Sequence, residues 1–522
     1  MLLIEAPFEP LQRGRLAPAL LKAELQQRGL GCDVEYLGHA FAALLGRDEY
    51  GRLIGEVPPA ALAADWVFAE ALFGPSASDP GAYVSDVLMS RWRLPRDLVD
   101  LVVRARRLAA DFVLRSLAEI DWPRYAVVGF SAPVGQTVAA LAVAKAVKEN
   151  RPDVRIVLGG PAWHGVMGRR QLAAFPFVDA ACTGDGDDAF PAYCAWVVTG
   201  CEGPAPPGLL LRRGVGRSQR FHLPTDDLDA LPIPDYTDLY RALDRWGGDA
   251  CGVQLAAEAS RGCWWAARRP CAFCGLNGHT PSYRPKSAAR ILSELREQDR
   301  RWRPWLIDLV DNVVPPAFLR EVLPRLAVSP LAAHLFFEAR PELTRAQVQL
   351  VARAGARLQL GIESLSQHVL DLVGKGTDAG GNLRQLAWCR DEGVPVTWNL
   401  LHDVPGETAR DYRELRELLP TLRRLPPPGG RGPVEVQRFS RYFARPASFG
   451  LVNVRPAAAY RHVYPYKPAV LQDIAYLFDA DPAPRVCADP GLEQERAAFL
   501  RELDEWLAVR PGAPGHAERE VA

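Results

Sequence analysis

Residues 258–278 read EASRGCWWAARRPCAFCGLNG and contain three of the ten cysteines of this 522-residue chain. The three are Cys263, Cys271 and Cys274, and a candidate strand, 254–259, leads directly into them. The cysteines are therefore expected on the loop at the carboxyl end of a strand. Three thiolates on one loop can each bind a different iron of a [4Fe–4S] cluster, which leaves one iron with an open coordination position. That position could bind the amino and carboxylate groups of S-adenosylmethionine (SAM).

Two other interpretations of the cysteines stay open. A zinc site would need a fourth ligand, which His279 could supply, but no second Cys-x2-Cys pair follows at the spacing of zinc modules. A thioredoxin-like redox pair of Cys271 and Cys274 would leave Cys263 without a role. The remaining cysteines are scattered through apolar sequence and are expected to be small buried side chains.

The composition narrows the class of protein. The chain has 62 basic and 62 acidic residues, so no overall field favours nucleic acid or an anionic membrane as a partner. Its 48% hydrophobic and 24% charged residues are typical of a soluble globular protein. The start lacks a signal-peptide pattern, and the longest apolar stretch, around 137–147, is too short to span a bilayer. We expect a cytoplasmic protein of about two to four domains.

The first 215 residues show an α/β pattern with a helical insertion at about 40–120. Continuous apolar strands that alternate with helices predict a parallel, Rossmann-like sheet covered on both faces. The expected strands are 2–6, 32–37, 125–130, 155–158 and 178–182, and the expected helices include 18–28 and 138–148. Ligands of such sheets lie beyond the carboxyl ends of the strands. Small residues that leave room there for a large flat ligand are Ser131, Ala132, Gly159, Gly160 and Gly184.

A second α/β region is expected over 251–440, after a linker rich in Pro and Asp over 216–250. Its expected strands are 254–259, 305–310, 335–339, 358–362, 396–401 and 434–439, with helices between them such as 287–298 and 346–354. Six β/α units predict a partial barrel, (β/α)6, that is open along one side. The rhythm is lost beyond 440, and 441–522 is expected to be a mixed C-terminal segment that caps the substrate.

At these residues the sequence resembles the radical SAM superfamily. More narrowly, it resembles the cobalamin-domain-containing maturases of ribosomally synthesised, post-translationally modified peptides (RiPPs). The usual superfamily loop is Cys-x3-Cys-x2-Cys, whereas the first gap here is seven residues, as in that maturase subgroup. The subgroup's RGCWW…CxFCGLNG loop matches 261–265 and 271–278. The resemblance covers nearly the whole chain and is strongest over 251–445.

The resemblance implies a set of SAM contacts in the second region. Phe273 is expected to pack on the adenine, and Gly406, in the turn NLLHDVPGE (399–407), to let the backbone approach that base. The resemblance also implies that Asp311 and Asn312 contact the methionyl amino group and that Glu363 and Ser364 contact the ribose hydroxyls. Glu338 and Arg340 lie at the end of the third strand, and Arg340 could pair with the methionyl carboxylate. A polar residue at a strand end can instead cap a helix or anchor a loop.

The N-terminal region resembles a cobalamin-binding domain in its strand order and in its turns GGPAWHG and TGDGDDAF. It lacks the Asp-x-His-x-x-Gly motif whose His ligates cobalt in many such domains, so that motif supplies no ligand here. His164 is a candidate replacement, and an ordinary hydrogen-bonding role at the surface is its alternative. The domain could also keep its fold without the cofactor and serve as a platform for the substrate.

The activity that the resemblance implies is C-methylation of an unactivated carbon in the core of a precursor peptide. Cleavage of SAM would give a 5′-deoxyadenosyl radical that abstracts hydrogen, methylcobalamin would supply the methyl group, and flavodoxin or ferredoxin would serve as external reductant. Arg438 and Tyr442 are candidate substrate contacts, and a packed cap is the alternative for their segment. Two other functions stay open: a radical epimerase, cyclase or crosslinking enzyme without methyl transfer, and a non-catalytic iron–sulfur scaffold.

Overall fold

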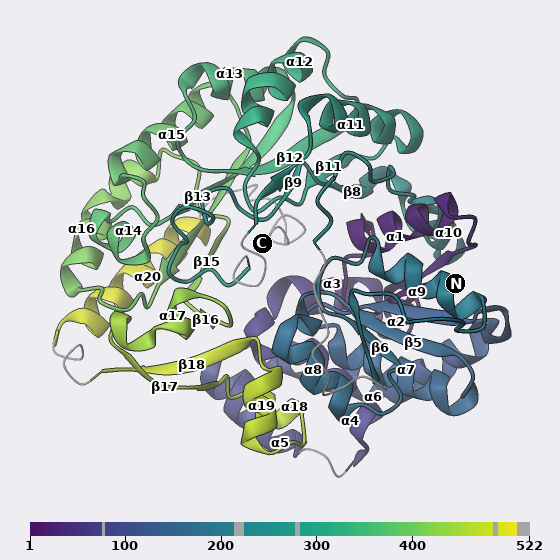
Figure 1. Ribbon diagram of the computed structural model, residues 1–522. Helices are drawn as coiled ribbons and strands as arrows, with labels where there is room; N and C mark the ends of the chain where they lie inside the picture. The colour runs from purple at the N-terminus through teal and green to yellow at the C-terminus, as the bar shows by residue number, and fades with distance from the viewer. Residues whose placement is uncertain (76–78, 213–223, 277–281, 484–488, 509–522) are drawn as a thin grey trace. The chain divides into compact units, whose positions relative to one another are not determined.

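The computed structural model describes residues 1–75, 79–212, 224–276, 282–483 and 489–508. The chain divides into two compact units, each with its own sheet (Figure 1). The first unit comprises Met1–Leu255 and Pro456–Tyr476, and the second comprises Ala256–Arg455 and Leu477–Ala522. The segment after residue 440 thus contributes to both units.

The sheet of the first unit has the order β3-β1-β4-β5-β6-β7. Its strands are β3 (Asp33–Tyr36), β1 (Leu2–Glu5), β4 (Val127–Ser131), β5 (Arg155–Gly159), β6 (Ala180–Cys182) and β7 (Leu209–Leu211). All pairs are parallel except β6 with β7, which confirms the predicted Rossmann-like sheet. The chain leaves β1 toward β3 on one side and β4 toward β5 on the other. The switch point where such sheets bind ligands therefore lies between β1 and β4, where Glu5 and Ser131 are paired in register.

Helices cover both faces of this sheet and fill the segment between β3 and β4. They are α1 (Leu16–Gln27), α2 (Leu37–Leu45), α3 (Arg47–Glu56), α4 (Ala63–Phe73), α5 (Pro80–Tyr83), α6 (Arg96–Glu119), α7 (Thr137–Asn150), α8 (Gly165–Ala174), α9 (Ala189–Val198), α10 (Thr237–Trp246), α18 (Tyr460–Val463) and α19 (Pro468–Ile474). Helix α4 packs on α7, and the buried Asp65 carboxylate of α4 accepts a hydrogen bond from Val138 N at 3.0 Å. The insertion is thereby fastened to the N-terminal end of a sheet-covering helix.

The second unit contains a row of parallel strands in the order β15-β14-β13-β12-β11-β8. Their bounds are β8 (Gln254–Ala257), β11 (Leu306–Leu309), β12 (His334–Ala339), β13 (Ala356–Glu363), β14 (Val396–His402) and β15 (Gly430–Pro433). Helices α11 (Ala288–Trp302), α12 (Leu323–Val328), α13 (Arg345–Arg353), α15 (Ala379–Asp391) and α16 (Ala409–Leu422) lie outside the strands (Figure 1). This arrangement confirms the predicted partial barrel. The first two residues of β8, Gln254 and Leu255, belong to the first unit, and they pair with its short strand β2 (Arg13–Gly14).

The sixth strand differs from the prediction. The sequence favours 434–439 because apolar and polar residues alternate there, but β15 comes earlier, at Gly430–Pro433. Gly and Pro are disfavoured inside sheets and tolerated on an edge strand, and β15 is the edge strand. The alternating residues instead form β16 (Val436–Gln437), which joins β18 (Leu477–Pro482) and β17 (Leu451–Pro456) in a small sheet.

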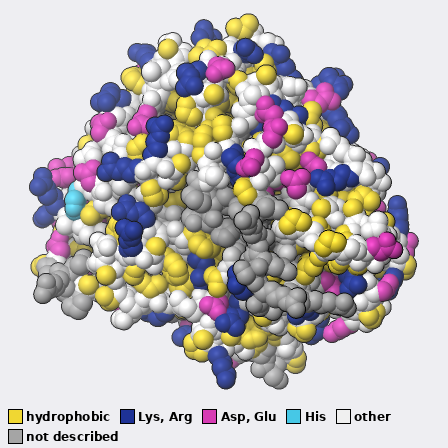
Figure 2. Space-filling model, in the orientation of Figure 1, with side chains coloured by type: hydrophobic (Ala, Val, Ile, Leu, Met, Phe, Trp, Pro, Cys, Tyr) yellow, Lys and Arg dark blue, Asp and Glu magenta, His cyan; other side chains and the backbone are white. Residues whose placement is uncertain are grey.

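The core of the second unit lies between the strands and their outer helices. Its largest buried side chains include Phe318, Phe337 and Trp398. The C-terminal helix α20 (Leu492–Ala508) packs on α16 and adds Phe499 and Leu503 to the same core. No helix of the described residues is long and apolar enough to cross a membrane. Figure 2 shows basic and acidic side chains interspersed over the face in view.

Candidate active site

The loop that carries the three cysteines begins directly after β9 (Ser260–Arg261), which pairs antiparallel with β10 (Arg284–Pro285). We call residues 262–276 the cluster loop; Asn277, Gly278 and His279 lie outside the described residues, as does Cys487. Gly262 has a φ of +80°, and a Cβ atom there would lie 2.7 Å from the carbonyl oxygen of Ser282. Only glycine fits at this position without moving the loop, and the position directly precedes Cys263.

The three cysteines all lie on the cluster loop, and two of them are strongly affected by burial. Burial is the largest cause of the raised pKa of Cys271 and of the pKa of about 11 at Cys274. The charge of Cys263 contributes less to both shifts. The described residues contain no group of three His, Cys, Asp or Glu side chains arranged around a single metal ion. A cubane cluster does not need such a group, because each thiolate binds a different iron.

Backbone hydrogen bonds fix the cluster loop between Cys271 and Cys274. Ala272 N donates to the carbonyl oxygen of Val373 at 2.8 Å, and Tyr442 N donates to the carbonyl oxygen of Ala272 at 3.1 Å. Gly275 N donates to Gln437 Oε1 at 3.0 Å. The end of α14 (Gln367–Val373) and the segment 437–442 therefore hold this part of the loop from two sides.

Both candidate substrate residues lie in or beside that segment and are buried. The Arg438 guanidinium lies 5.2 Å from the ring centroid of Phe443 and 5.0 Å from that of Phe478. Tyr442 is fully buried, and its ring centroid is 4.8 Å from that of Phe449. Both side chains pack within the protein beside the cluster loop, and a contact with substrate stays a prediction.

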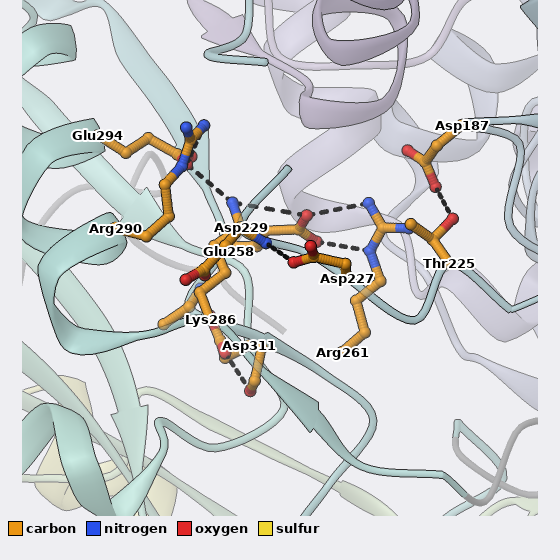
Figure 3. A network of polar contacts seen from close by, with 12 residues as sticks. Asp187, Thr225, Asp227, Asp229, Glu258, Arg261, Lys286, Arg290, Glu294 and Asp311 are labelled. Atoms are coloured by element: carbon orange, nitrogen blue, oxygen red, sulfur yellow. Dashed lines mark hydrogen bonds and ion pairs between the residues drawn. The ribbon is translucent and has the colours of Figure 1, made fainter. Parts of the chain in front are cut away.

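A network of buried charges lies at the base of the cluster loop (Figure 3). Lys286 Nζ lies 2.8 Å from Glu294 Oε2 and 3.7 Å from Glu258 Oε1. Arg261 donates two hydrogen bonds of 2.9 Å to the Glu258 carboxylate. Lys286, Glu258 and Glu294 are each at most 5% exposed, and buried charges of this kind are stable only when they are paired. The network fixes Arg261, two residues before the first cysteine.

Asp311 also holds the segment from which the cluster loop begins. Its Oδ2 accepts a hydrogen bond from Ala259 N at 2.8 Å, and its Oδ1 accepts one from Ser260 Oγ at 2.5 Å. Burial raises the pKa of Asp311 to about 7. The carboxylate thus anchors the chain where β8 turns into the loop, which is the loop-anchor alternative for a strand-end residue. The adjacent Asn312 is exposed, and the contact of both residues with a methionyl amino group stays a prediction.

Glu338 lies near the end of β12, and Glu363 is the last residue of β13. The pairing of β13 with β14 shifts between Leu360 and Glu363, and Glu363 has a φ of +62°. Such a bulge redirects a side chain at the end of a strand. Burial, and to a lesser extent the charge of Glu363, raise the pKa of Glu338 to about 8. A cation bound beside Glu338 would favour its ionised form.

Two cations accompany these carboxylates. Lys375 Nζ lies 2.8 Å from Glu363 Oε1, and this partner raises the pKa of Lys375 although burial alone lowers it. Arg340 donates to the carbonyl oxygen of Lys375 at 2.9 Å and to Glu342 Oε2 at 2.7 Å. Ser364 Oγ accepts a hydrogen bond from Ser366 N at 3.1 Å and so stabilises the turn after β13. The structure therefore brings the ends of the third and fourth predicted strands together beside the cluster loop.

Sequence reasoning missed Lys375 and Asp308. Lys375 lies between Gly374 and Gly376, which both have positive φ, and a lysine between two such glycines marks a side chain held at a tight turn. Asp308 is only 2% exposed on the apolar strand β11, and its charge raises the pKa of Glu338. A lone carboxylate in an otherwise apolar strand was the available signal.

The predicted adenine contacts also come together. Phe273 packs with Val369, Val373 and Val404 in one apolar cluster, which Leu401 borders. Gly406 has a φ of +94°, and a Cβ atom there would lie 3.0 Å from Leu372 Cδ2. Phe273 and the turn after β14 therefore belong to one apolar cluster, although they are far apart in the sequence.

In the first unit, packing between the strand ends is itself a reason for the small residues found there. Ala132 N donates to the carbonyl oxygen of Gly159 at 2.9 Å. A Cβ atom on Gly160, whose φ is +103°, would lie 3.3 Å from the backbone of Ala132, and one on Gly159 would lie 3.2 Å from Cys182 Cβ. Packing of the strand ends therefore requires these glycines whether or not a ligand binds. Gly184 follows β6, and His164 directly precedes α8.

A buried polar group lies at the switch point of this sheet. Gln136 Nε2 donates to the carbonyl oxygen of Phe8 at 3.0 Å and to Glu9 Oε2 at 3.1 Å, and Arg15 is paired with Glu9. Burial raises the pKa of Glu5 to about 7. Within the described part of the chain, Glu5 Oε2, Arg15 Nε and Gln136 Oε1 are buried without a hydrogen-bond partner. Buried polar atoms of this kind are rare unless a ligand or water pairs with them.

Comparisons with known proteins identify the second unit. The model of the Radical SAM superfamily matches residues 258–419, and this part of the chain is a radical SAM domain. Such domains use a [4Fe–4S] cluster and SAM, as expected from the cysteine loop. An uncharacterised methyltransferase of Pyrococcus horikoshii is 24% identical over 294 residues, which cover 55% of this chain and 62% of the relative. The chain thus spans less than two thirds of that relative's length.

Two solved structures share the fold of nearly the whole chain. The radical SAM methyltransferase TsrM from Kitasatospora setae, with cobalamin and a [4Fe–4S] cluster bound, is 15% identical. Its match covers 98% of this chain and 91% of TsrM with a TM-score of 0.60. The cobalamin-dependent radical enzyme OxsB, with aqua-cobalamin and SAM bound, is 13% identical over 99% of this chain and 69% of OxsB, with a TM-score of 0.59. These likenesses confirm the predicted two-part α/β fold.

Proposed function

We propose that this chain is a cobalamin-dependent radical SAM methyltransferase that methylates an unactivated carbon of a peptide. The observation that carries the proposal is a loop with three thiols that is held beside Arg340 and the Lys375–Glu363 pair, at the carboxyl ends of the parallel strands β12 and β13. In barrel enzymes this is the face on which catalytic sites are built. When bound, the cluster supplies the electron for cleavage of SAM, and cobalamin supplies the methyl group.

In the second unit, Cys263, Cys271 and Cys274 would hold the cluster. Glu338 suits the methionyl ammonium group, because a cation placed beside it favours the ionised carboxylate that burial and Glu363 disfavour. Glu363 could accept hydrogen bonds from the ribose hydroxyls while it stays paired with Lys375. Phe273 and the turn at Gly406 would enclose the adenine.

The first unit would bind cobalamin at its switch point. Both structurally similar enzymes bind this cofactor, and the corrin ring carries amide side chains that donate and accept hydrogen bonds. Such amides could satisfy Glu5 Oε2, Arg15 Nε and Gln136 Oε1. Ser131, which is paired in register with Glu5, and the small residues at the ends of β4 and β5 would line the cofactor site. The absence of Asp-x-His-x-x-Gly means that this motif supplies no ligand to cobalt.

The proposed substrate is the core of a precursor peptide. A second structure of TsrM contains tryptophan as substrate, so free tryptophan is the alternative that an assay must include. Flavodoxin or ferredoxin is the proposed reductant, and a cytoplasmic location stays a prediction.

The test uses the full chain, reconstituted without oxygen with iron, sulfide and hydroxocobalamin and then desalted. We expect a corrin spectrum to co-elute, and we expect SAM and reductant to yield 5′-deoxyadenosine and to transfer a labelled methyl group to a precursor peptide. Absence of both products would contradict the proposal. Formation of 5′-deoxyadenosine without corrin or methyl transfer would favour the epimerase, cyclase or crosslinking alternative, and transfer to tryptophan alone would exclude the peptide.

A further inference from the structure

The C-terminal helix α20 is attached to the second unit by charged and apolar contacts. Arg416 of α16 lies 2.9 Å from Glu495 and 2.5 Å from Glu502, and Arg431 of β15 lies 2.6 Å from Asp504. On the inner side of the helix, the ring centroids of Phe499 and Tyr412 are 5.9 Å apart. These contacts hold α20 against α16 and β15.

Arg496 in this helix reaches the turn that follows β14. Its guanidinium is paired with Asp403 and lies 3.7 Å from Glu407 Oε1, and Glu493 Oε1 lies 2.5 Å from its other terminal nitrogen. The Arg496 side chain is 18% exposed, so solvent screens these charges only in part. One cation of the C-terminal helix therefore joins both carboxylates of the turn 402–407.

The turn contains a residue in the left-handed conformation. Asp403 has a φ of +58°, which Asp adopts more readily than most residues, and its side chain contacts both His402 and Arg496. His402 Nδ1 lies 2.9 Å from Asp403 Oδ2, and Glu407 Oε2 accepts a hydrogen bond from Val404 N at 2.9 Å. Burial raises the pKa of Glu407 to about 7, so Asp403 is the carboxylate of this turn whose charge Arg496 chiefly neutralises.

We propose that Arg496 is a positioning residue for the adenine of SAM. This inference rests on the proposed function, in which the turn at Gly406 and Phe273 enclose the base. Val404 lies in the same apolar cluster as Phe273, so a shift of the turn moves one side of the proposed adenine site. A backbone that hydrogen-bonds the adenine edge distinguishes an amino group from an oxygen at the same place, and it loses this discrimination when it is displaced.

The test compares Arg496→Met with Arg416→Met in the full chain, each loaded with a full complement of cluster iron. Arg416 anchors the same helix but contacts Glu495 and Glu502 instead of the turn, so its variant controls for helix docking. Equilibrium dialysis gives the Kd of S-adenosylhomocysteine and of its deaminated analogue, S-inosylhomocysteine. For Arg496→Met we expect about tenfold weaker binding of the adenosyl compound and loss of most of its preference over the inosyl compound. For Arg416→Met we expect both Kd values within about twofold of wild type.

Each outcome decides the inference. Wild-type affinity and preference in Arg496→Met would overturn it, and so would an equal loss in Arg416→Met, because the effect would then come from helix docking. If Arg496→Met does not fold, Asp403→Asn removes the same ion pair from the side of the turn and must show the same loss of adenine preference. If the wild-type protein with a full cluster binds neither compound, the proposed function itself fails.

Discussion

Replacing Lys286 with Met is expected to destabilise the second unit by about 3 kcal/mol. Lys286 is 2% exposed and pairs with Glu294, which is also 2% exposed, at 2.8 Å. Removing one partner of a buried ion pair costs about 3–5 kcal/mol, because the other charge is left in the protein interior. The lower end of this range applies because both glutamates retain another ion-pair partner: Arg290 lies 3.3 Å from Glu294, and Arg261 is paired with Glu258.

Urea unfolding followed by circular dichroism measures this loss, and Arg300→Met is the control. Arg300 pairs with Glu297 on α11, the helix that also carries Glu294. The Arg300 side chain is 72% exposed, so its replacement is expected to cause no measurable change in stability. Adding Glu294→Gln to Lys286→Met removes the uncompensated charge and should recover about 1 kcal/mol or more. A loss below about 1 kcal/mol in Lys286→Met, or no recovery in the double variant, would refute the argument that the network is a set of buried, mutually dependent charges.

Three further predictions concern the cofactor site. Gly262→Ala should lose most cluster iron, because its Cβ would lie 2.7 Å from the Ser282 carbonyl oxygen. Gly355→Ala is the control: Gly355 has a similar φ of +65°, but a Cβ atom there would have no atom within 4 Å, so this variant should keep the iron. Because burial raises the pKa of Glu338 to about 8, its ionised fraction falls about 25-fold between pH 8.5 and pH 6.5, and SAM should bind more weakly by about the same factor. Glu338→Gln should abolish this dependence when Kd is measured by dialysis. Cys271→Ala should abolish SAM cleavage and lower the iron content. Cys389→Ser and Cys487→Ser should leave the iron content nearly unchanged; Cys389 is a buried thiol of α15. Wild-type cleavage in Cys271→Ala would contradict the cluster assignment.

Sequence patterns predict the parallel part of the fold well, because buried strands such as β12 and β13 appear as short apolar runs between amphipathic helices. The edge strand β15 escapes this reasoning, since Gly430, Gly432 and Pro433 carry no strand signal and the neighbouring residues do. Arg496 escapes it as well, because an arginine on an amphipathic helix looks like any solvated charge until the packing of α20 brings it to Asp403. Local pattern thus finds the elements and the cysteines, while contacts between distant segments determine which charges surround them.

The seven-residue gap between Cys263 and Cys271 departs from the usual spacing, and the structure gives it a physical role. The gap contains Trp264, whose Nε1 donates to the carbonyl oxygen of Val314 at 3.1 Å. It also contains Trp265, whose ring centroid lies 3.7 Å from the Arg340 guanidinium. A Cβ atom on Gly376 would lie 2.5 Å from the same ring, so the Trp265 ring packs directly on the backbone beside Lys375. The longer loop is therefore fixed by packing. Its two tryptophans connect the segment after the first cysteine to the end of β12 and to the Lys375 turn, whose charged side chains lie in the proposed cofactor site.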